Sequence, residues 1–392
     1  MLQEKLSLIV VAHKFAWTTK DIVDGLTHRY CGLYANLCKL VLRYGGSAFW
    51  YSAKDRVLLK LPEKAKVLKC GIFRSLLTVT SDNISRGVFT VIILDYPHSF
   101  LGVKHLLDYL ASLLLLHLIR LLNRGFIVVD NMDPPIEHAI ELSGKVTLLQ
   151  YILWSFLNRL VYSFDLVVYH SQSYRVYHKL YYGINYDRSI VIPPGSFPEM
   201  MSYEEPPQEE SIRVICSGSV SKWVGINNLL KIVKMLNRNN VRAEFVVIDR
   251  AFPKDINIGG IKVIRHYMGY RTFLDTLKRS HILLLLRPKS LHHLLTVRAS
   301  LPDYLVVGRP ILYPKSLGSR ELVQDAGCCY EFDKIEDITK LIPVLADDKA
   351  LLKNISLTAR LFAEKHMVYM ERAKKLLVEI LSRLSHTSKC GL

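Results

Sequence analysis

The sequence predicts an α/β protein built from two doubly wound, mainly parallel sheets. Short apolar runs rich in Val, Ile and Leu alternate with longer amphipathic stretches, which is the pattern of βαβ units. An acidic segment with two adjacent prolines, residues 199–211, interrupts this alternation, which then restarts. The length of 392 residues also exceeds that of a typical single domain. Two domains joined by one linker therefore account for the whole pattern.

The first part of the chain contains a series of short predicted strands. They cover residues 6–12, 48–51, 90–94, 126–129, 166–170 and 189–192. Helical patterns at 32–44 and 101–123 separate some of these strands, as the crossover helices of a parallel sheet do. We therefore place the first domain at residues 1–198.

After the linker at 199–211, the alternation forms a second domain at residues 212–365. Predicted strands cover 212–217, 243–248, 261–266, 281–286 and 310–313, and predicted helices cover 226–238, 270–279 and 301–307. The tail at 338–385 is mostly helical, and we expect its last part, 366–392, to pack back on the first domain. Ligands of such sheets bind at the carboxyl ends of the strands, so the natural site is the cleft between two domains.

The composition is that of a basic globular protein. Lys plus Arg number 52 and Asp plus Glu number 35, which leaves a net charge of +17. This excess indicates an anionic partner: a nucleic acid, a phosphorylated small molecule or an anionic membrane. The seven cysteines form no CxxC pair and no zinc-like spacing, so we expect neither a disulfide framework nor a structural metal. Reduced cysteines are typical of a cytoplasmic protein.

Several common fingerprints do not occur in the sequence. There is no GxxxxGK[ST], no GxGxxG after the first strand, no GxSxG and no HExxH. Their absence argues against a P-loop nucleotidase, a standard NAD enzyme, a serine hydrolase and a zinc protease. No nucleic-acid-binding motif is present either, so nucleic-acid binding rests on net charge alone and ranks last.

Three motifs follow one another in a fixed order. Residues 165–196 contain a strand, a helix and a strand that ends in IPPGS, and residues 215–230 (ICSGSVSKWVGINNLL) contain a strand, small residues, a Lys and a helix. Residues 298–310 read RASLPDYLVVGRP and lead into a strand. Together these motifs resemble the two-domain GT-B glycosyltransferases, most closely the family-four-like enzymes of the group 1 type. The resemblance extends from about Phe126 to the C-terminus.

The resemblance implies two Rossmann-like domains that face a central cleft. It also implies transfer of a sugar, of the hexosyl type, from a nucleotide-sugar donor to a hydroxyl acceptor. Transfer on this fold usually needs no protein-bound metal, and the donor is a substrate, so no cofactor is expected. The pair His292-His293 could suggest a metal, but no third ligand is evident.

The donor site is expected where the third motif begins. The leaving diphosphate gains negative charge, which a helix N-terminus preceded by small residues stabilises with its backbone N–H groups. In this family the acid of that helix binds the ribose, and a Lys or Arg binds the phosphates. The implied donor residues are Gly218, Ser219, Lys222, Tyr267, Arg287, Arg298, Ser300, Pro302, Asp303 and Tyr304.

Each donor residue also has a simpler interpretation. Asp303 could be an ordinary acid in a first helical turn, and Tyr267 could be a surface aromatic rather than a platform for a base. The sequence also departs from the family pattern, because Leu295 stands where the first of two acids is usual and Ser219 where an Arg is usual. These departures support a second hypothesis, a catalytically degenerate homologue that binds a nucleotide sugar or a membrane. A nucleotide-sugar epimerase on the same fold is a further alternative.

The acceptor side is expected at strand ends of the first domain. Asp130 and Asp133 follow one predicted strand, and His98 follows another. An Asp there could act as general base on an acceptor hydroxyl or could orient it, whereas the simpler role is to cap the following helix. We expect at least one of the two aspartates to be functional, with His98 a weaker candidate.

Two segments bear on membrane contact. The most apolar stretch, residues 109–123, is too short to span a bilayer and is interrupted by His117 and Arg120, so we expect it to cover the sheet. A basic run suits contact with anionic lipid; it consists of Lys54, Arg56, Lys60, Lys64, Lys66, Lys69 and Arg74. We therefore expect a cytoplasmic protein with peripheral contact to the cytoplasmic membrane face, and a lipid-linked sugar or glycolipid as acceptor.

Overall fold

A computed structural model describes most of the chain. The described residues are 6–22, 25–96, 106–122, 125–131, 133–183, 185–209, 211–217, 226–249, 256–264, 269–287 and 289–389. The chain divides into two compact units. Unit 1 comprises Met1–Asp21, Leu26–Pro193 and Tyr369–Leu392, and unit 2 comprises Ile22–Gly25 and Pro194–Val368.

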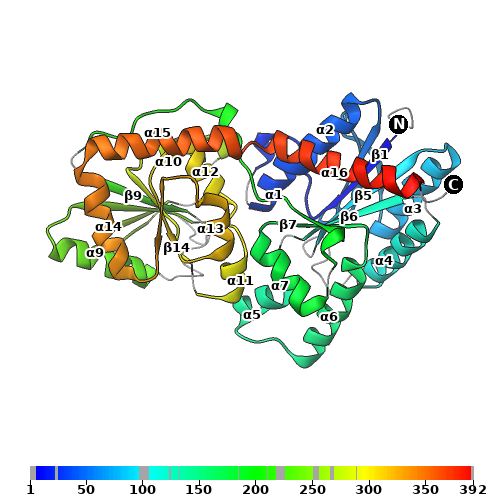
Figure 1. The fold of residues 1–392 in the computed structure, drawn as a ribbon, viewed down its shortest axis with the longest axis horizontal. Coiled ribbons are helices and arrows are strands. Elements are labelled where there is room, and N and C mark those ends of the chain that lie inside the picture. Colours follow the sequence, from blue (N-terminus) through cyan, green and yellow to red (C-terminus); the bar gives the residue numbers. More distant parts are fainter. Residues whose placement is uncertain are drawn as a thin grey trace. The chain divides into compact units, whose positions relative to one another are not determined.

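Unit 1 is built on a mainly parallel sheet with the strand order β4-β3-β2-β1-β5-β6-β7-β8 (Figure 1). The strands are β1 (Leu6–Ala12), β2 (Ser47–Ser52), β3 (Val57–Leu61), β4 (Ala65–Lys69), β5 (Phe89–Tyr96), β6 (Gly125–Asn131), β7 (Leu166–Tyr169) and β8 (Ser189–Val191). The α-helices are α1 (Gly25–Arg29), α2 (Ala35–Arg43), α3 (Ile72–Ser85), α4 (Leu106–Leu121), α5 (Pro135–Ser143), α6 (Leu148–Tyr162), α7 (Gln172–Tyr182) and α16 (Tyr369–Lys389). Short 3₁₀ helices are η1 (Thr19–Asp21) and η5 (Tyr186–Arg188), and η2 (Tyr30–Tyr34) is a π-helix.

The central strands of unit 1 have mainly apolar middles because both faces of the sheet are covered, and their polar residues lie near the strand ends. Ile9 of β1 pairs in register with Phe49 of β2 on one side and with Ile92 of β5 on the other. Ile9 and Ile92 are both fully buried. The six predicted strands of this part are therefore confirmed, with bounds that differ by at most two residues at an end.

The hairpin β3–β4, which forms one edge of the sheet, was not predicted from the sequence. The two strands pair antiparallel to each other, and β3 pairs antiparallel to β2. The predicted basic run lies on and around this hairpin, and its Lys and Arg side chains are exposed. Charged side chains on an edge strand prevent pairing with other chains, which gives this run a structural role.

Helix α16 completes unit 1 from the far end of the sequence. It lies beside α2 and η2, as the red and blue helices show in Figure 1. Tyr369 is buried against Gly32 of η2, where an added Cβ would lie 2.2 Å from the Tyr369 ring. His28 Nδ1 lies 3.0 Å from the Tyr369 hydroxyl, and Arg372 donates to the carbonyl of Pro193 at 2.7 Å.

Unit 2 contains a second sheet with the order β11-β12-β10-β9-β13-β14-β15. Its strands are β9 (Ile212–Ser217), β10 (Ala243–Ile248), β11 (Ile256–Ile258), β12 (Ile261–Ile264), β13 (Ile282–Leu284), β14 (Ile311–Pro314) and β15 (Cys329–Phe332). Its helices are η6 (Pro198–Met200), α9 (Ile226–Arg238), α10 (Tyr270–Lys278), α11 (Leu291–Leu295), α12 (Ser300–Val307), α13 (Leu317–Val323), α14 (Ile335–Asp347) and α15 (Lys349–His366).

All pairs in the second sheet are parallel except β11 with β12. The predicted α/β class with two doubly wound sheets is therefore confirmed, while the short strands β11 and β15 were not predicted. In the part of the chain that the structure describes, no helix is long and apolar enough to cross a membrane.

Arg309 fixes the linker to the body of unit 2. This fully buried guanidinium donates to the carbonyls of Lys278 at 2.7 Å, Ser280 at 2.8 Å and Glu204 at 2.9 Å. Burial lowers the pKa of Arg309 to about 10. The preceding Gly308 ends α12 with a φ of 71°, a conformation that favours glycine, and an added Cβ would lie 2.8 Å from a backbone oxygen.

Candidate functional site

The switch point of the second sheet lies between β9 and β13. The chain builds β10 on one side of β9 and β13 on the other, so the crossover connections diverge there. Arg298 reaches the carboxyl ends of both strands: it donates to the carbonyl of Ser217, which ends β9, and to the carbonyl of Leu286 at 3.4 Å, just after β13. A permanently charged guanidinium is thereby held at the position where doubly wound sheets bind ligands.

Helix α12 begins beside this arginine. Pro302 stands in its first turn, where a missing N–H leaves no hydrogen bond unmade. The Ser300 hydroxyl is buried and has no hydrogen-bond partner among the described residues. An unsatisfied buried hydroxyl at a helix N-terminus is a group that a bound anion can satisfy.

Tyr304 attaches the same helix to β9. The backbone N–H of Ser217 donates to the Tyr304 hydroxyl at 2.9 Å, and the two hydroxyls lie 2.8 Å apart. Burial raises the pKa of Tyr304 well above that of a free phenol, so the hydroxyl stays neutral. The predicted residues Arg298, Ser300, Pro302 and Tyr304 are therefore brought together at the switch point.

Asp303 lies in the same helix but is only 4% exposed. Its Oδ1 accepts hydrogen bonds from the Ser196 hydroxyl at 2.6 Å and the Tyr270 hydroxyl at 2.5 Å. The backbone N–H of Ser196 in turn donates to the carbonyl of Met367 at 2.6 Å. Asp303 thus connects α12 to α10 and to the segment after Pro194, while the predicted ribose contact stays a prediction.

Arg287 contacts a histidine, while its predicted role in donor binding stays a prediction. Its guanidinium donates to Nδ1 of His293, which is buried in the short helix α11. Ser290 caps that helix, with its hydroxyl accepting from the backbone N–H of His293 at 3.2 Å. Leu295, which stands in place of a family acid, is buried at the end of the same helix.

Five predicted site residues lie outside the described residues. They are Gly218, Ser219, Lys222, Tyr267 and His98. Their assigned roles stay predictions.

The structure places Asp130 at the end of β6, where the side chain is 1% exposed. Arg29 binds both carboxylate oxygens, with Nε 2.6 Å from Oδ2 and Nη2 2.7 Å from Oδ1. The Tyr34 hydroxyl donates to Oδ2 at 2.5 Å. Burial alone would raise the pKa of Asp130, but the charge and hydrogen bonds of Arg29 hold it below the usual carboxyl value.

The switch point of the first sheet lies between β1 and β5, because the chain adds β2 on one side of β1 and β5 on the other. Asp95 of β5 is buried there and accepts from the Tyr30 hydroxyl and, at 3.4 Å, from the backbone N–H of His13. Asp133, the other predicted acid, is half-buried before α5, and its carboxylate lies within 4.8 Å of a ring nitrogen of His138.

The partners of these acids were not predicted from the sequence. Arg29, Tyr30 and Tyr34 come from the helical segment after β1, and the rings of the two tyrosines stack at 5.5 Å. The π-helix η2 contains both tyrosines, and π-helical turns occur frequently at functional sites. Arg29 directly before the aromatic and apolar run YCGLYA was the available signal, since a buried guanidinium requires an acid.

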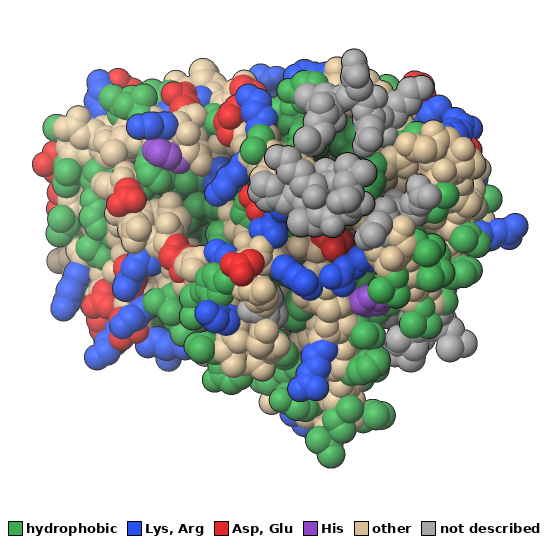
Figure 2. Space-filling model, turned by 45° about the vertical axis from the view of Figure 1, so that its right-hand side comes forward, with side chains coloured by type: hydrophobic (Ala, Val, Ile, Leu, Met, Phe, Trp, Pro, Cys, Tyr) green, Lys and Arg blue, Asp and Glu red, His purple; other side chains and the backbone are tan. Residues whose placement is uncertain are grey.

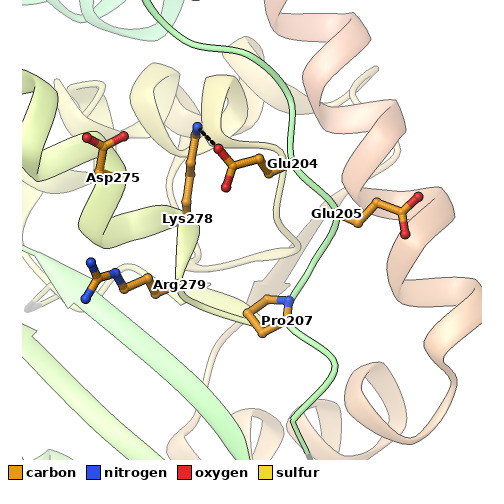
Figure 3. Close-up of a pocket in the computed structure, with 6 residues that line it drawn as sticks. All are labelled: Glu204, Glu205, Pro207, Asp275, Lys278 and Arg279. Carbon is orange, nitrogen blue, oxygen red and sulfur yellow. Dashed lines mark hydrogen bonds and ion pairs between the residues drawn. The ribbon is translucent and has the colours of Figure 1, made fainter.

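One cavity of about 490 Å³ lies elsewhere on unit 2 (Figure 3). Glu204, Glu205 and Pro207 of the linker line one side, and Asp275, Lys278 and Arg279 line the other. Lys278 Nζ and Glu204 Oε1 form an ion pair at 2.5 Å across it. Arg279 precedes β13, so the cavity lies at the amino ends of the strands, opposite the edge that carries Arg298.

No protein-family model matches the sequence, and no curated protein sequence matches it. Solved structures do match. Sucrose-phosphate synthase from Thermosynechococcus elongatus superposes with a TM-score of 0.66 at 10% identity, over 98% of this chain and 100% of that one. The chain has the GT-B fold.

Two further GT-B structures support this assignment. Anabaena Alr3699/HepE, solved in complex with UDP, matches with a TM-score of 0.58 at 11% identity, over 96% of this chain and 100% of that one. WaaG, a glycosyltransferase involved in lipopolysaccharide biosynthesis, matches with a TM-score of 0.50 at 14% identity, over 78% of this chain and 95% of that one. The GT-B architecture expected from the three motifs is therefore confirmed.

The contacts of Asp303 give a testable prediction. The family role expected for Asp303 predicts that Asp303→Ala weakens donor binding and leaves the fold intact, but in the structure this substitution also removes the acceptor for two buried hydroxyls. We expect a loss of about 2–3 kcal/mol in the free energy of unfolding of unit 2, because buried donors would be left unsatisfied. Urea unfolding measures this loss, and Asp325→Ala, which removes an exposed acid of the same unit, should change it by less than about 0.5 kcal/mol. Equal stability of both variants would contradict the anchoring role.

Proposed function

We propose that the protein is a glycosyltransferase that transfers a hexosyl group from a nucleotide-sugar donor to a hydroxyl acceptor. The observation that carries this proposal is the Arg298 guanidinium at the switch point of the second sheet, beside the N-terminus of α12. The unsatisfied Ser300 hydroxyl lies in the same helical turn. A leaving diphosphate needs such positive potential and such donors, because its negative charge grows as the sugar leaves.

The arrangement suggests how the diphosphate is stabilised. Arg298 can offer its remaining N–H donors as a fork, and the first turn of α12 offers backbone N–H groups. We propose that these groups, rather than a protein-bound metal, neutralise the leaving group. The UDP complex of HepE supports a nucleoside diphosphate as the ligand class.

The acceptor base is proposed in unit 1. A general base works best when its pKa lies near the operating pH and one lone pair is accessible. Asp130 is a weak candidate, because Arg29 and Tyr34 occupy its oxygens and Arg29 lowers its pKa. Asp133 is half-buried, and we propose it as the base, with Asp130 as a residue that positions β6 and η2.

This assignment predicts a selective effect on turnover. Asp133→Asn should lower kcat by about 10²–10⁴-fold, the range for loss of a general base, with little change in donor affinity. Steady-state kinetics and donor titration measure the two effects separately. Asp187→Asn, which changes an exposed acid of unit 1, is the matched control. Full turnover in the Asp133 variant would remove this residue from the mechanism.

We further propose that the acceptor is a lipid-linked sugar or glycolipid, presented at the cytoplasmic membrane face. The lipopolysaccharide role of WaaG supports this class of acceptor. The test combines thermal-shift binding across nucleotide sugars and polynucleotides with sugar transfer to a membrane lipid extract. Stabilisation by one nucleotide sugar together with a new glycolipid is the expected result. Stabilisation by polynucleotides alone would overturn the proposal.

A degenerate binding homologue is the second candidate. Leu295 favours it, because this buried apolar side chain stands where an acid is usual in the family that the sequence resembles. The same experiment separates the two candidates. Donor binding without product, and without hydrolysis of the nucleotide sugar, would favour the degenerate homologue.

A further inference from the structure

Helix α6 turns an apolar face towards solvent. Leu148 is 74% exposed, Leu149 77%, Ile152 55% and Phe156 54%. A helix on the surface of a globular protein normally presents polar side chains to water and apolar ones to the core. The capping box formed by Thr147 and Gln150 defines the start of this exposed helix.

The helical period places three of the exposed residues on one side of α6, while residues 148–153 are exposed on every side of its first turns. Leu148, Ile152 and Phe156 are spaced by four residues, and Arg159 follows three residues later, so they lie along one stripe. The opposite side of the helix carries Leu157 and Val161, which are buried. The helix therefore has two apolar sides, and the body of unit 1 covers one of them.

The adjoining helix α7 extends this surface. The ring of Tyr162 in α6 lies 6.0 Å from that of Tyr182 in α7, and α7 exposes Leu180 and Tyr181. Figure 2 shows apolar side chains gathered at the lower tip in that view, over the beginning of α6. We use the name α6 face for the exposed residues Leu148, Leu149, Tyr151, Ile152, Leu153 and Phe156 of α6 with Leu180 and Tyr181 of α7.

The charges carried by α6, α7 and the segment between them are mostly positive, whereas the neighbouring helix α5 contributes Glu137, which the Tyr177 hydroxyl contacts. Between Lys145 and Tyr186 the sequence contains two Lys and two Arg residues but a single acid, Asp165. Asp165 is paired with Arg120, whose Nε lies 2.8 Å from its Oδ1. Lys145, Arg159 and Lys179 are exposed at the start of α6, near its end and on α7.

We propose that the α6 face docks unit 1 on the surface of an anionic lipid bilayer. Exposed aliphatic and aromatic side chains can enter the interface of the bilayer, while flanking cations bind the anionic head groups. A second copy of this chain is a poorer occupant, because a symmetric contact would bring the face with Lys145, Arg159 and Lys179 against the same basic face of the partner. This inference rests on the proposed function only for the lipid nature of the acceptor, and the binding itself requires no donor.

The proposal assigns membrane contact to a different surface from the one that the sequence predicts. The basic run on β3 and β4 has exposed charges but less exposed apolar surface than the α6 face: Leu58 and Leu61 are buried, and Val67 of β4 is 43% exposed. Cations alone bind anionic lipid weakly and in a salt-sensitive way, whereas inserted apolar side chains resist salt. The two surfaces can therefore be separated by experiment.

Vesicle flotation of the full-length protein tests the proposal, with phosphatidylcholine vesicles that contain or lack phosphatidylglycerol. The apolar variant is Leu148→Gln/Leu149→Gln/Ile152→Gln. Its matched control is Leu361→Gln/Val344→Gln/Val378→Gln, since these three residues are exposed apolar positions on other helices. A charge variant of the α6 face, Lys145→Glu/Lys179→Glu, is compared with one of the hairpin, Lys60→Glu/Lys66→Glu.

We expect wild-type protein to float with the anionic vesicles, and the apolar variant to lose at least about tenfold in partitioning. The α6 charge variant should lose binding to anionic vesicles, while the hairpin and helix controls keep it. No flotation of wild-type protein, or equal flotation of the apolar variant, would overturn the proposal. Loss of binding only in the hairpin variant would assign the contact to β3 and β4 instead.

Two further measurements separate membrane docking from self-association and from donor binding. Sedimentation without vesicles reports the oligomeric state. If wild-type protein is a dimer that does not float, and the apolar variant is a monomer, the α6 face is an interface between copies and not a membrane-docking surface. Donor binding by thermal shift is measured in parallel on every variant. We expect the apolar variant to bind the donor as wild-type protein does while it no longer floats with vesicles. If wild-type protein binds no donor, the proposed function is refuted, and the membrane result still stands.

Discussion

Asp130→Asn should destabilise unit 1 by about 3–5 kcal/mol, the range for breaking a buried ion pair. The substitution leaves the Arg29 guanidinium buried and charged, with its strongest acceptor removed. Unfolding can be followed through the fluorescence of Trp50, which is fully buried and whose ring lies 6.1 Å from that of Tyr34. A loss below about 1 kcal/mol would show that the ion pair is not the anchor that the geometry indicates.

A second variant and a pH series sharpen this test. Arg29→Met/Asp130→Asn removes both charges and should recover much of the lost stability. Asp82→Asn, which alters the exposed pair with Arg86, should change stability by less than about 0.5 kcal/mol.

The Arg29–Asp130 pair also predicts a pH dependence, because the pKa of Asp130 is depressed in the folded state. The pair stabilises the fold above the unfolded pKa of about 3.9, and this stabilisation is lost as the pH falls through the folded pKa. The difference between wild type and Asp130→Asn should therefore shrink below about pH 4.

Arg298→Leu should weaken nucleotide-sugar binding by about 10²–10³-fold, comparable with the loss of one strong donor from an anion site. The reason is that Arg298 is the guanidinium that the structure holds at the carboxyl ends of both β9 and β13. Isothermal titration with the nucleotide sugar found in the binding panel, and with the free nucleoside diphosphate, measures the effect on each. Both affinities should fall together, because the proposed contact is to the phosphates rather than to the sugar.

Arg238→Leu is the matched control for Arg298. Arg238 is an exposed arginine at the C-terminal end of α9 in the same unit, so the same charge is lost at the opposite edge of the sheet. Its donor affinity should remain within about twofold of wild type at moderate salt, because screening weakens a distant charge. An equal loss in both variants would show a general electrostatic effect and not a phosphate site at Arg298.

The strands that carry most of the fold could be predicted from the sequence. The bounds predicted for β1, β9 and β10 are those of the structure, because short runs rich in Val, Ile and Leu mark strands buried on both faces. The hairpin β3–β4 was missed, because an edge strand such as β4 is mostly exposed and Lys-rich and so lacks that signal. Strand β15 was missed for a similar reason, since only Phe332 in it is fully buried.

The candidate site was predictable only in its local parts. The order of small residues, Pro302 and Tyr304 after Arg298 marks a helix that begins at a strand end, and the structure places these groups together. The Arg29–Asp130 pair joins residues 101 positions apart, and a local pattern contains no information on such a pairing. Likewise, the helix α6 was not predicted, and its sequence contains no information on which of its sides the rest of unit 1 leaves in water.

The position of α16 has a consequence for synthesis in the cell. Tyr369–Lys389 follows unit 2 in the sequence but supplies the Tyr369 ring that fills the space over Gly32 in unit 1. Apart from Ile22–Gly25, unit 2 is continuous in the sequence from Pro194 to Val368, so it can fold as soon as that stretch has left the ribosome. Unit 1, most of which is translated first, therefore completes its core only after α16 has left the ribosome. Until then, the part of its core that Tyr369 covers is accessible to chaperones.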